Sequence, residues 1–95
     1  MAAQVVPVAL TGADQTISPT ACTYHGFAIR ETTTTTVAVV RIYDSTSANS
    51  GTLLETLSIA ANESVGDFYE RGIVANLGIR VDIVSGTVEG SIRIS

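Results

Sequence analysis

The sequence predicts an all-β domain, a single antiparallel β-sandwich of seven to eight short strands that spans residues 1–95. Apolar and polar residues alternate in several short stretches, and a period of two is typical of strands with one buried face. Ten threonines lie between Thr20 and Thr56, which adds to a β-branched bias that favours strands. Turn residues separate the stretches, and no stretch has a helical period. We expect a jelly-roll connection, with an immunoglobulin-like connection as the alternative.

The first three strands are expected before the threonine-rich region. Pro7 has no N–H group to donate, so the first strand should lie at a sheet edge or carry a bulge. Pro19 should end the second strand. The predicted ranges are Gln4 to Leu10, Gln15 to Ser18 and Cys22 to Glu31.

The third strand has a clear alternation, which predicts the residues that face the core. Phe27 and Ile29 share one parity and should point inward, whereas Tyr24 lies on the opposite parity and should point outward. His25 shares the parity of Phe27 but lies near the start of the strand. The five threonines from Thr32 to Thr36 are interpreted as a connection to the next strand.

The next strand, Val37 to Tyr43, is apolar on both faces, and only Arg41 is charged. Such a strand is usually central and covered on both sides. In a domain this small, a second chain would supply the outer cover. We therefore name Val40 and Ile42 as candidate interface residues.

A second hairpin with an exposed loop is predicted around Asp44 to Gly51, a run of polar turn residues. Its other strand is Thr52 to Ala60. In that strand Leu53, Leu57 and Ile59 should share the apolar face.

The segment from Asn62 to Gly72 mixes turn residues with aromatic ones and is interpreted as a short strand between loops. Together with the loop from Asp44 to Gly51, it is the predicted contact region, because loops carry recognition on a sandwich. Aromatic and arginine side chains dominate interface energetics. Phe68, Tyr69 and Arg71 are therefore the candidate contact residues of this segment.

The last eighteen residues, from Gly78 to Ser95, alternate twice around Ser85-Gly86. A two-residue loop whose glycine takes a positive φ suits a tight hairpin, so the two flanking stretches are predicted to pair with each other. This register places Asp82 opposite Glu89, and like charges so placed are destabilising. A calcium ion between them is the alternative, but such sites usually need six or more oxygen ligands.

Composition excludes several functional classes. The net charge of −4, with five arginines and no lysine, argues against nucleic-acid binding. No apolar run is long enough to cross a membrane, and the N-terminus has no basic stretch followed by an apolar one, so neither a membrane span nor a signal peptide is expected.

The chain contains few residues suited to catalysis. Cys22 and His25 point to opposite faces of an extended strand, and zinc would need two further nitrogen or sulfur ligands. A single cysteine forms no internal disulfide, and Cys22 is interpreted as a small buried apolar residue. The nucleotide-binding and nucleophile-elbow motifs do not occur. We expect no catalytic, cofactor-binding or metal site, and no enzyme activity.

The second half of the chain has an overall pattern that is found elsewhere. It contains the passage TLLETLSIAANESVGDFY, then Gly-Ile, then the passage GIRVDIVSGTVEGSIRI. This pattern resembles small virion proteins of tailed bacteriophages, among them the capsid decoration, or cement, proteins. The resemblance implies a trimer on local threefold positions of a capsid, where it braces neighbouring shell subunits, and it implies no catalytic residues.

The expected function is therefore that of a structural protein on the exterior of a virion capsid, made in the host cytoplasm. Its expected partners are a major capsid protein and copies of itself, as a homo-oligomer that the resemblance implies to be a trimer. The apolar excess supports this, since exposed apolar patches mark interfaces and symmetric oligomers cover them. The alternative is a carbohydrate- or ligand-binding module of a phage fibre or cell-surface protein, which would use its exposed aromatic residues. The candidates for that use are Tyr24, Tyr43, Phe68 and Tyr69.

Overall fold

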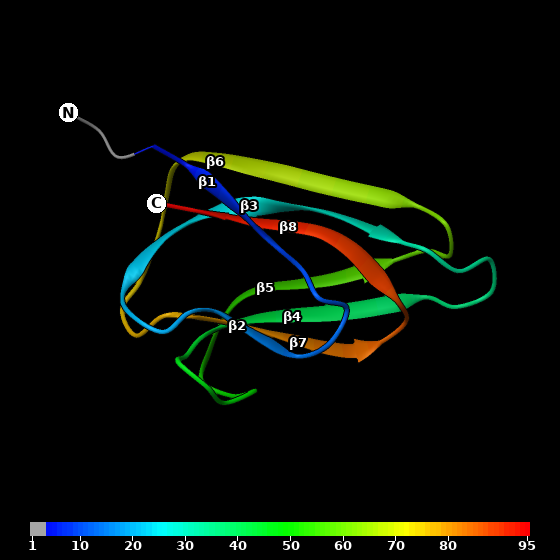
Figure 1. The fold of residues 1–95 in the computed structure, drawn as a ribbon, viewed down its shortest axis with the longest axis horizontal. Helices are drawn as coiled ribbons and strands as arrows, with labels where there is room; N and C mark the ends of the chain where they lie inside the picture. Colours follow the sequence, from blue (N-terminus) through cyan, green and yellow to red (C-terminus); the bar gives the residue numbers. More distant parts are fainter. Residues whose placement is uncertain (1–3) are drawn as a thin grey trace.

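The protein is a β-sandwich. The computed structural model describes residues 4–95, which form eight strands and no helix, arranged as two four-stranded antiparallel sheets packed face to face (Figure 1). The predicted fold class is confirmed. The strands are β1 (Val6–Ala9), β2 (Gln15–Ser18), β3 (Cys22–Glu31), β4 (Ala38–Asp44), β5 (Thr52–Ile59), β6 (Ser64–Ala75), β7 (Ile79–Ser85) and β8 (Val88–Ile94).

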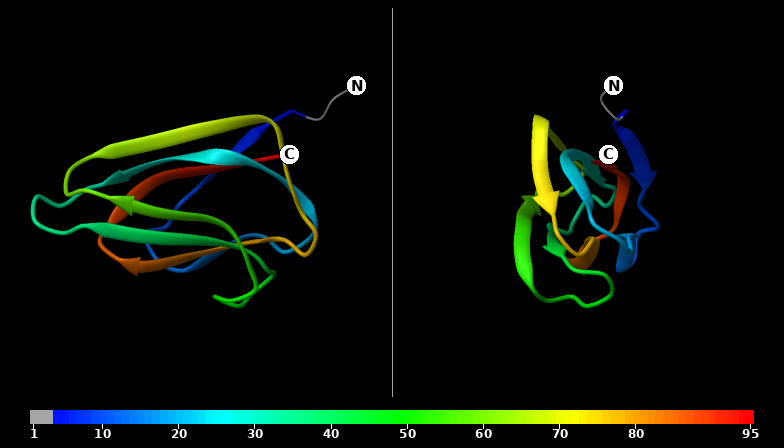
Figure 2. Two further views of the ribbon diagram at one scale, coloured as in Figure 1. Left: turned by 180° about the vertical axis from the view of Figure 1, so that it is seen from behind. Right: turned by 90° about the vertical axis from the view of Figure 1, so that its left-hand side faces the viewer.

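The strand order is that of a jelly roll. Sheet A has the order β1-β8-β3-β6 and sheet B the order β2-β7-β4-β5. β1 pairs with β8, β2 with β7, β3 with β6 and β4 with β5, so the chain is one long antiparallel ribbon, folded back at the β4–β5 loop and rolled into two layers (Figure 2). The jelly-roll connection is therefore the one adopted. Only β4 and β5 are consecutive strands of one sheet.

The predicted C-terminal hairpin is wrong. β7 lies in sheet B between β2 and β4, whereas β8 lies in sheet A between β1 and β3. Alternation requires only that one face of each strand points inward, and this holds equally for two strands in opposite sheets. Ser85-Gly86 is still a tight connection, and Gly86 has the expected positive φ of 84°. A Cβ atom at Gly86 would lie 2.7 Å from Ala38 and from the carboxylate of Glu31, so glycine is required there.

Separating these strands also removes the predicted opposition of Asp82 and Glu89. Asp82 lies opposite Arg41 of β4, and Glu89 lies opposite Arg30 of β3. The Arg30 and Glu89 side chains form an ion pair of 3.4 Å at the surface. The two carboxylates thus lie in different sheets, each opposite an arginine, so the repulsion that a calcium ion would have offset does not arise.

A bulge in β3 changes which residues face the core. Tyr24 pairs with Ile94 of β8 and Gly26 pairs with the preceding Arg93, so His25 is an extra residue in β3. The parity of the strand therefore shifts at His25. Tyr24 points inward and is fully buried, contrary to the prediction, while Phe27 and Ile29 point inward as predicted.

The other strands of the first half follow the predictions closely. β1 is at the edge of sheet A, as Pro7 predicted, and the threonine run connects β3 to β4. β4 is central in sheet B and forms the predicted hairpin with β5. A bulge between the partners of Ile42 and Tyr43 shifts the parity of β5, so Leu54 packs on the core and Leu53 is exposed.

β6 is the longest strand, with twelve residues, where a short strand between loops was predicted. Gly66 and Gly72 lie within it and are not turns. Tyr24 pairs with Ile73 and Gly26 with Phe68, so residues 69–72 face only His25 and form a wide bulge in β6. Gly72 has a φ of 77° in this bulge, and a side chain there would collide with Thr23. The turn residues of the segment thus serve a bulge inside an edge strand.

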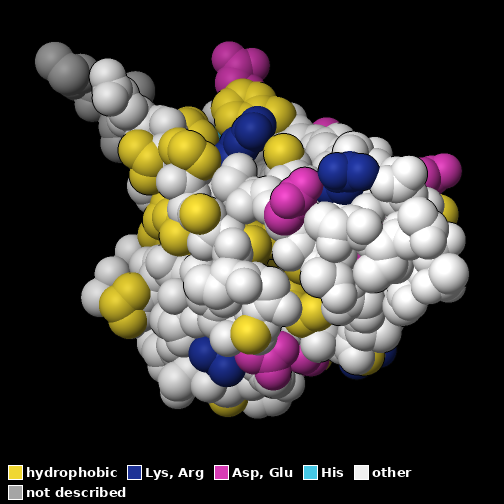
Figure 3. Space-filling view, turned by 45° about the vertical axis from the view of Figure 1, so that its right-hand side comes forward, with side chains coloured by type: hydrophobic (Ala, Val, Ile, Leu, Met, Phe, Trp, Pro, Cys, Tyr) yellow, Lys and Arg dark blue, Asp and Glu magenta, His cyan; other side chains and the backbone are white. Residues whose placement is uncertain are grey.

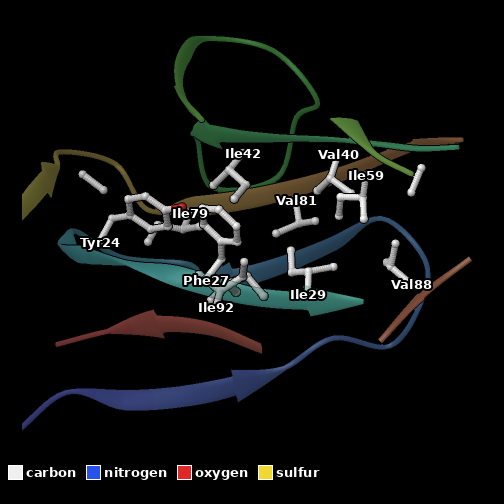
Figure 4. Packing of buried hydrophobic residues seen from close by; sticks show 13 residues of the cluster. Tyr24, Phe27, Ile29, Val40, Ile42, Ile59, Ile79, Val81, Val88 and Ile92 are labelled. Atoms are coloured by element: carbon white, nitrogen blue, oxygen red, sulfur yellow. The ribbon is translucent and has the colours of Figure 1, made fainter. Parts of the chain in front are cut away.

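The core lies between the two sheets (Figure 4). Tyr24, Phe27 and Ile29 of β3 point toward the aliphatic side chains of sheet B. Val40 and Ile42 are 0% exposed and belong to this core. Their proposed place in an interface is therefore corrected, because β4 is apolar on its inner face to pack against sheet A.

In residues 4–95 there is no helix long and apolar enough to span a membrane. The expectation that the chain carries no signal peptide rests on its first residues, and Met1 to Ala3 lie outside the described residues.

Candidate functional site

Exposed apolar side chains concentrate on one strand. Eight large apolar residues are exposed in the described part of the chain, and four of them lie on β6 or in the connection that follows it. They define what we call the β6 apolar surface: Phe68, Ile73, Val74 and Leu77, of which Val74 is the most exposed at 66%. β6 is an edge strand that pairs only with β3. This surface is the largest concentration of exposed apolar residues along the sequence.

The row of Ile73 across sheet A is apolar but faces the core, because its member Tyr24 is fully buried. Val6 pairs with Ile94, Ile94 with Tyr24, and Tyr24 with Ile73, so one row of apolar residues crosses the whole of sheet A. Val6 and Ile73 are exposed because they lie on the two edge strands. Figure 3 shows apolar side chains gathered at this end of the molecule, at the upper left of the view.

The predicted contact residues of β6 have different environments. The Phe68 ring is 51% exposed and stacks on His25, with the ring centroids 5.9 Å apart. The Tyr69 ring lies 6.0 Å from the buried Tyr24 ring, and its hydroxyl donates a hydrogen bond to Glu55 of β5. Arg71 is exposed in the bulge. Phe68 and Arg71 are therefore accessible to a partner, whereas Tyr69 connects the two sheets along their edge.

The hydrogen bond between Tyr69 and Glu55 also changes the acidity of the phenol. Donation to the Glu55 carboxylate, together with burial, raises the pKa of Tyr69 to about 12. Tyr69 is therefore a neutral donor at physiological pH. Tyr24 and Tyr43 are buried, so of the four aromatic residues proposed for stacking on a ligand only Phe68 is exposed.

His25 fills the bulge of β6. Nδ1 lies 2.8 Å from the carbonyl oxygen of Tyr69, which can only accept a hydrogen bond, so Nδ1 carries a proton. Nε2 lies 2.8 Å from the hydroxyl of Ser95 and in the neutral ring accepts its hydrogen bond. The imidazole thus satisfies a backbone group that the bulge removes from the ladder, and it connects the end of the chain to β3 and β6.

A hydroxyl and an imidazole so placed are also two parts of a nucleophilic triad. The third part, a carboxylate that orients the ring, is replaced here by the Tyr69 carbonyl. The bonds of His25 are accounted for by the bulge, and Cys22 packs against the core. We therefore assign His25 a structural role at the β6 edge of sheet A.

The loop from residues 45–51 is less available than predicted, because side chains fasten it to sheet B. Asn49 donates a hydrogen bond to the carboxylate of Asp14 and accepts one from Nε of Arg80, at 2.8 and 2.9 Å. The hydroxyl of Thr16 donates to the carbonyl oxygen of Thr46. Arg80 pairs with Tyr43 of β4, so the loop crosses the outer face of sheet B at that end. At the Tyr43 end of β4 the outer cover is therefore supplied by the chain itself, whereas Arg41 remains exposed.

Two carboxylates stabilise the connections between the sheets. Asp44 accepts hydrogen bonds from the backbone N–H groups of Asn76, Leu77 and Gly78, in the β6–β7 connection. Burial alone would raise the pKa of Asp44, but these donors lower it below its ordinary value of 3.8.

Glu31 is fully buried at the other end of the sandwich and accepts hydrogen bonds from the backbone N–H groups of Thr33 and Thr87. The hydrogen bonds from Thr33 and Thr87 lower the pKa of Glu31, against the opposing effect of burial. The carboxylate therefore fastens the β3–β4 connection to the β7–β8 connection.

The outer face of sheet A is hollowed at its centre. Two hollows, of about 410 and 490 Å³, meet at Ala28 of β3. Arg30 and Glu89 border the first hollow, and Phe68 and Arg93 border the second. Sequence reasoning missed this site. The signal in the sequence was the small residues at outward-facing positions of neighbouring strands, but the strand order was needed to align them.

In residues 4–95 no three His, Cys, Asp or Glu side chains lie close enough together to hold a metal ion. No family model, curated protein or solved structure matches the chain.

Proposed function

We propose that this chain is a non-enzymatic structural protein of a bacteriophage virion, which assembles with copies of itself through the β6 apolar surface and binds to the capsid exterior. The observation that carries the proposal is the concentration of half of the exposed large apolar residues on β6 and in the connection that follows it. Contiguous exposed apolar surface marks protein interfaces in soluble proteins. The resemblance of the second half of the chain to decoration proteins supplies the capsid as the partner.

The edge of β6 favours contact through side chains. Free sheet edges can add a strand from another chain, but a bulge interrupts the ladder and prevents continuous pairing. Residues 69–72 form such a bulge in the middle of β6. We therefore expect copies to associate through Phe68, Ile73 and Val74, with Arg71 at the rim. A closed ring of three copies would cover this surface on each of them.

The β6 apolar surface is also placed for a lattice partner. Val6, on the opposite edge strand of sheet A, is also exposed, so a further apolar side chain is accessible at the same end of the sandwich. Copies that associate along β6 would leave the rest of this end free for the capsid. The resemblance to decoration proteins implies such a contact, because those proteins brace neighbouring shell subunits.

The test is the oligomeric state of matched variants. The wild-type protein should behave as a trimer in light scattering coupled to size exclusion, and Val74→Asp should shift it to a monomer, because a carboxylate in the interface would be buried without a partner. Val84→Asp is the control, since Val84 is 48% exposed but lies on β7 in the other sheet, and it should leave the trimer intact.

Binding to capsids should follow the same pattern. Co-sedimentation with expanded phage capsids that lack their own decoration protein should retain the wild type and Val84→Asp and lose Val74→Asp. A monomeric wild type that does not sediment with any capsid tested would overturn the proposal.

A further inference from the structure

His25, the only histidine of the chain, lies against the β6 apolar surface. The imidazole is 6% exposed and stacks on the Phe68 ring, with the centroids 5.9 Å apart and the ring planes at 19°. Phe68 itself is 51% exposed. In the proposed assembly a second copy covers Phe68, so water is then excluded above this face of the imidazole as well.

The hydrogen bonds of His25 fit both of its protonation states. In the neutral ring Nδ1 donates to the carbonyl oxygen of Tyr69, and Nε2 accepts from the hydroxyl of Ser95. In the protonated ring Nε2 donates instead, so the Ser95 hydroxyl must turn its own hydrogen away. Ser95 is half-buried, and water can accept that hydrogen. A separate subunit can therefore take up a proton at His25 without losing either partner.

The surroundings of His25 provide no compensation for a positive charge. On the strands that flank it, the nearest charged and titratable groups in the ladder are Arg93 of β8 and Asp67, Tyr69 and the exposed Glu70 and Arg71 of β6. Arg93 lies opposite Gly26, directly after His25, and is itself a cation. Asp67 lies opposite the core-facing Phe27, so its carboxylate is on the inner side of sheet A. In residues 4–95 no carboxylate forms an ion pair with His25, so a charge on the ring is stabilised by water.

We propose that His25 makes the self-association of this chain pH-dependent: copies assemble through the β6 apolar surface while the imidazole is neutral and separate when it is protonated. The inference rests on the proposed assembly function and adds the regulation of that same surface. Histidine is suited to such a switch, because its side chain changes charge between roughly pH 5 and pH 8.

The direction of the effect follows from the loss of water at the interface. Covering Phe68 removes part of the water that stabilises a protonated imidazole, and burying a charge without a partner is unfavourable. The attraction of the cation to the Phe68 ring is present in both states and is smaller than this cost. The assembled state therefore binds the proton less tightly than the separate subunits. Assembly is strongest above the titration range of His25 and weakens as the pH falls through it.

The experiment is sedimentation equilibrium of the full-length protein at about pH 7.5 and about pH 5.5, an interval in which histidine titrates and ordinary carboxyl groups stay charged. A trimer contains three copies of His25. A loss of about twofold at each site multiplies to a rise of about tenfold in the dissociation constant of the trimer at the lower pH.

Two variants separate His25 from other titrating groups. His25→Gln keeps a donor and an acceptor but takes up no proton, so it should remove the pH dependence. Asp82→Asn is the control. Burial and the neighbouring Asp14 raise the pKa of Asp82, so its charge could also change, but it lies in sheet B, and the variant should keep the pH dependence of the wild type.

A second measurement protects the test if His25→Gln does not fold. The Cε1–H signal of His25 is followed by NMR against pH in the wild type and in Val74→Asn, which places an uncharged polar group in the β6 apolar surface and should be monomeric. The signal should titrate at a pH about 0.3 units higher in the monomer, which corresponds to the twofold loss at each site.

The outcomes distinguish this inference from the assembly proposal. A trimer whose dissociation constant is the same at both pH values, pH dependence that persists in His25→Gln, or equal NMR midpoints in trimer and monomer would overturn the switch and leave the assembly proposal standing. A wild type that is monomeric at both pH values would overturn both.

Discussion

The outer faces of the two sheets differ in what covers them. Sheet B is crossed by the chain's own β4–β5 loop, which Asn49 fastens to Asp14 and Arg80. In the part of the chain that the structure describes, the outer face of sheet A is instead hollowed at Ala28. The cause lies in the topology, because the ribbon folds back once, between β4 and β5, and both of these strands belong to sheet B.

This difference indicates which face is left for other molecules. On sheet B, Tyr43 is buried although it points outward, and Arg80 is occupied by Asn49 and Thr16. On sheet A, the ion pair of Arg30 and Glu89 is exposed to solvent, and Phe68 is half exposed. Surface pairs of this kind contribute little to stability. The polar groups at the loop end of sheet B thus hold the fold together, whereas the exposed pair of Arg30 and Glu89 on sheet A contributes little to its stability.

The largest change in the free energy of unfolding should follow a substitution of Asp44, at the base of the covering loop. Asp44→Ala removes the acceptor for three backbone N–H groups of residues 76–78, and we expect a loss of about 2 kcal/mol in the free energy of unfolding. Urea titration measures this loss in the free energy of unfolding. Asp67→Ala, at an exposed site on sheet A, is the control and should cost less than about 0.5 kcal/mol.

The effect of Asp44 should also depend on pH. Because folding lowers the pKa of Asp44, its carboxylate stabilises the fold above the ordinary pKa of 3.8, and this stabilisation is lost as the pH falls through the folded value. The difference between the wild type and Asp44→Ala should therefore shrink in acid. A constant difference from neutral pH to the acid limb would contradict the role of the charge.

A smaller effect is expected from Asn49. Asn49→Ala should release the loop from the face of sheet B, lower the free energy of unfolding by about 1 kcal/mol, and speed amide hydrogen exchange at residues 45–51. Sheet B would then resemble sheet A in having an open face. Asn76→Ala, at another exposed asparagine, is the control, and equal exchange in all three proteins would show that Asn49 does not hold the loop.

The smallest changes in the free energy of unfolding are expected for residues on the inner faces of the two sheets, which also differ. Sheet B contributes only aliphatic side chains to the cluster of fully buried core residues, whereas sheet A contributes Tyr24, whose buried hydroxyl has no hydrogen-bond partner in residues 4–95. Tyr24→Phe should leave the free energy of unfolding unchanged or raise it by up to about 1 kcal/mol. Tyr69→Phe, which loses the bond to Glu55, should lower it by about 1 kcal/mol. A marked destabilisation by Tyr24→Phe would reveal a partner for its hydroxyl.

Sequence reasoning predicted most strands within one or two residues and the edge position of β1 from Pro7 alone. Its errors share one cause, which is that a local pattern does not show what it pairs with. The alternation around Ser85-Gly86 was read as a hairpin, and the opposition of Asp82 and Glu89 that followed was the clue against it. Bulges at His25 and in β5 reversed the faces of Tyr24 and Leu53, and no residue pattern marks a bulge of this kind.

The candidate site was predicted in part. Phe68 and Arg71 are exposed on β6, whereas Val40 and Ile42 are buried between the sheets. An apolar strand has the same composition whether its second face meets another chain or a loop of its own. The hollows on sheet A were missed because Ala28, Gly66 and Glu89 are far apart in the sequence and become neighbours only through the order of the strands.

The sequence by itself determined that this chain forms strands, which side chains most of them turn inward, and where several of them end, because these depend on period, branching and turn residues within a few positions. The tertiary structure alone decided which strands are neighbours, which connections change sheet, and which face stays open. Those features depend on contacts between distant residues, and the free energy of such contacts is not encoded in any single stretch.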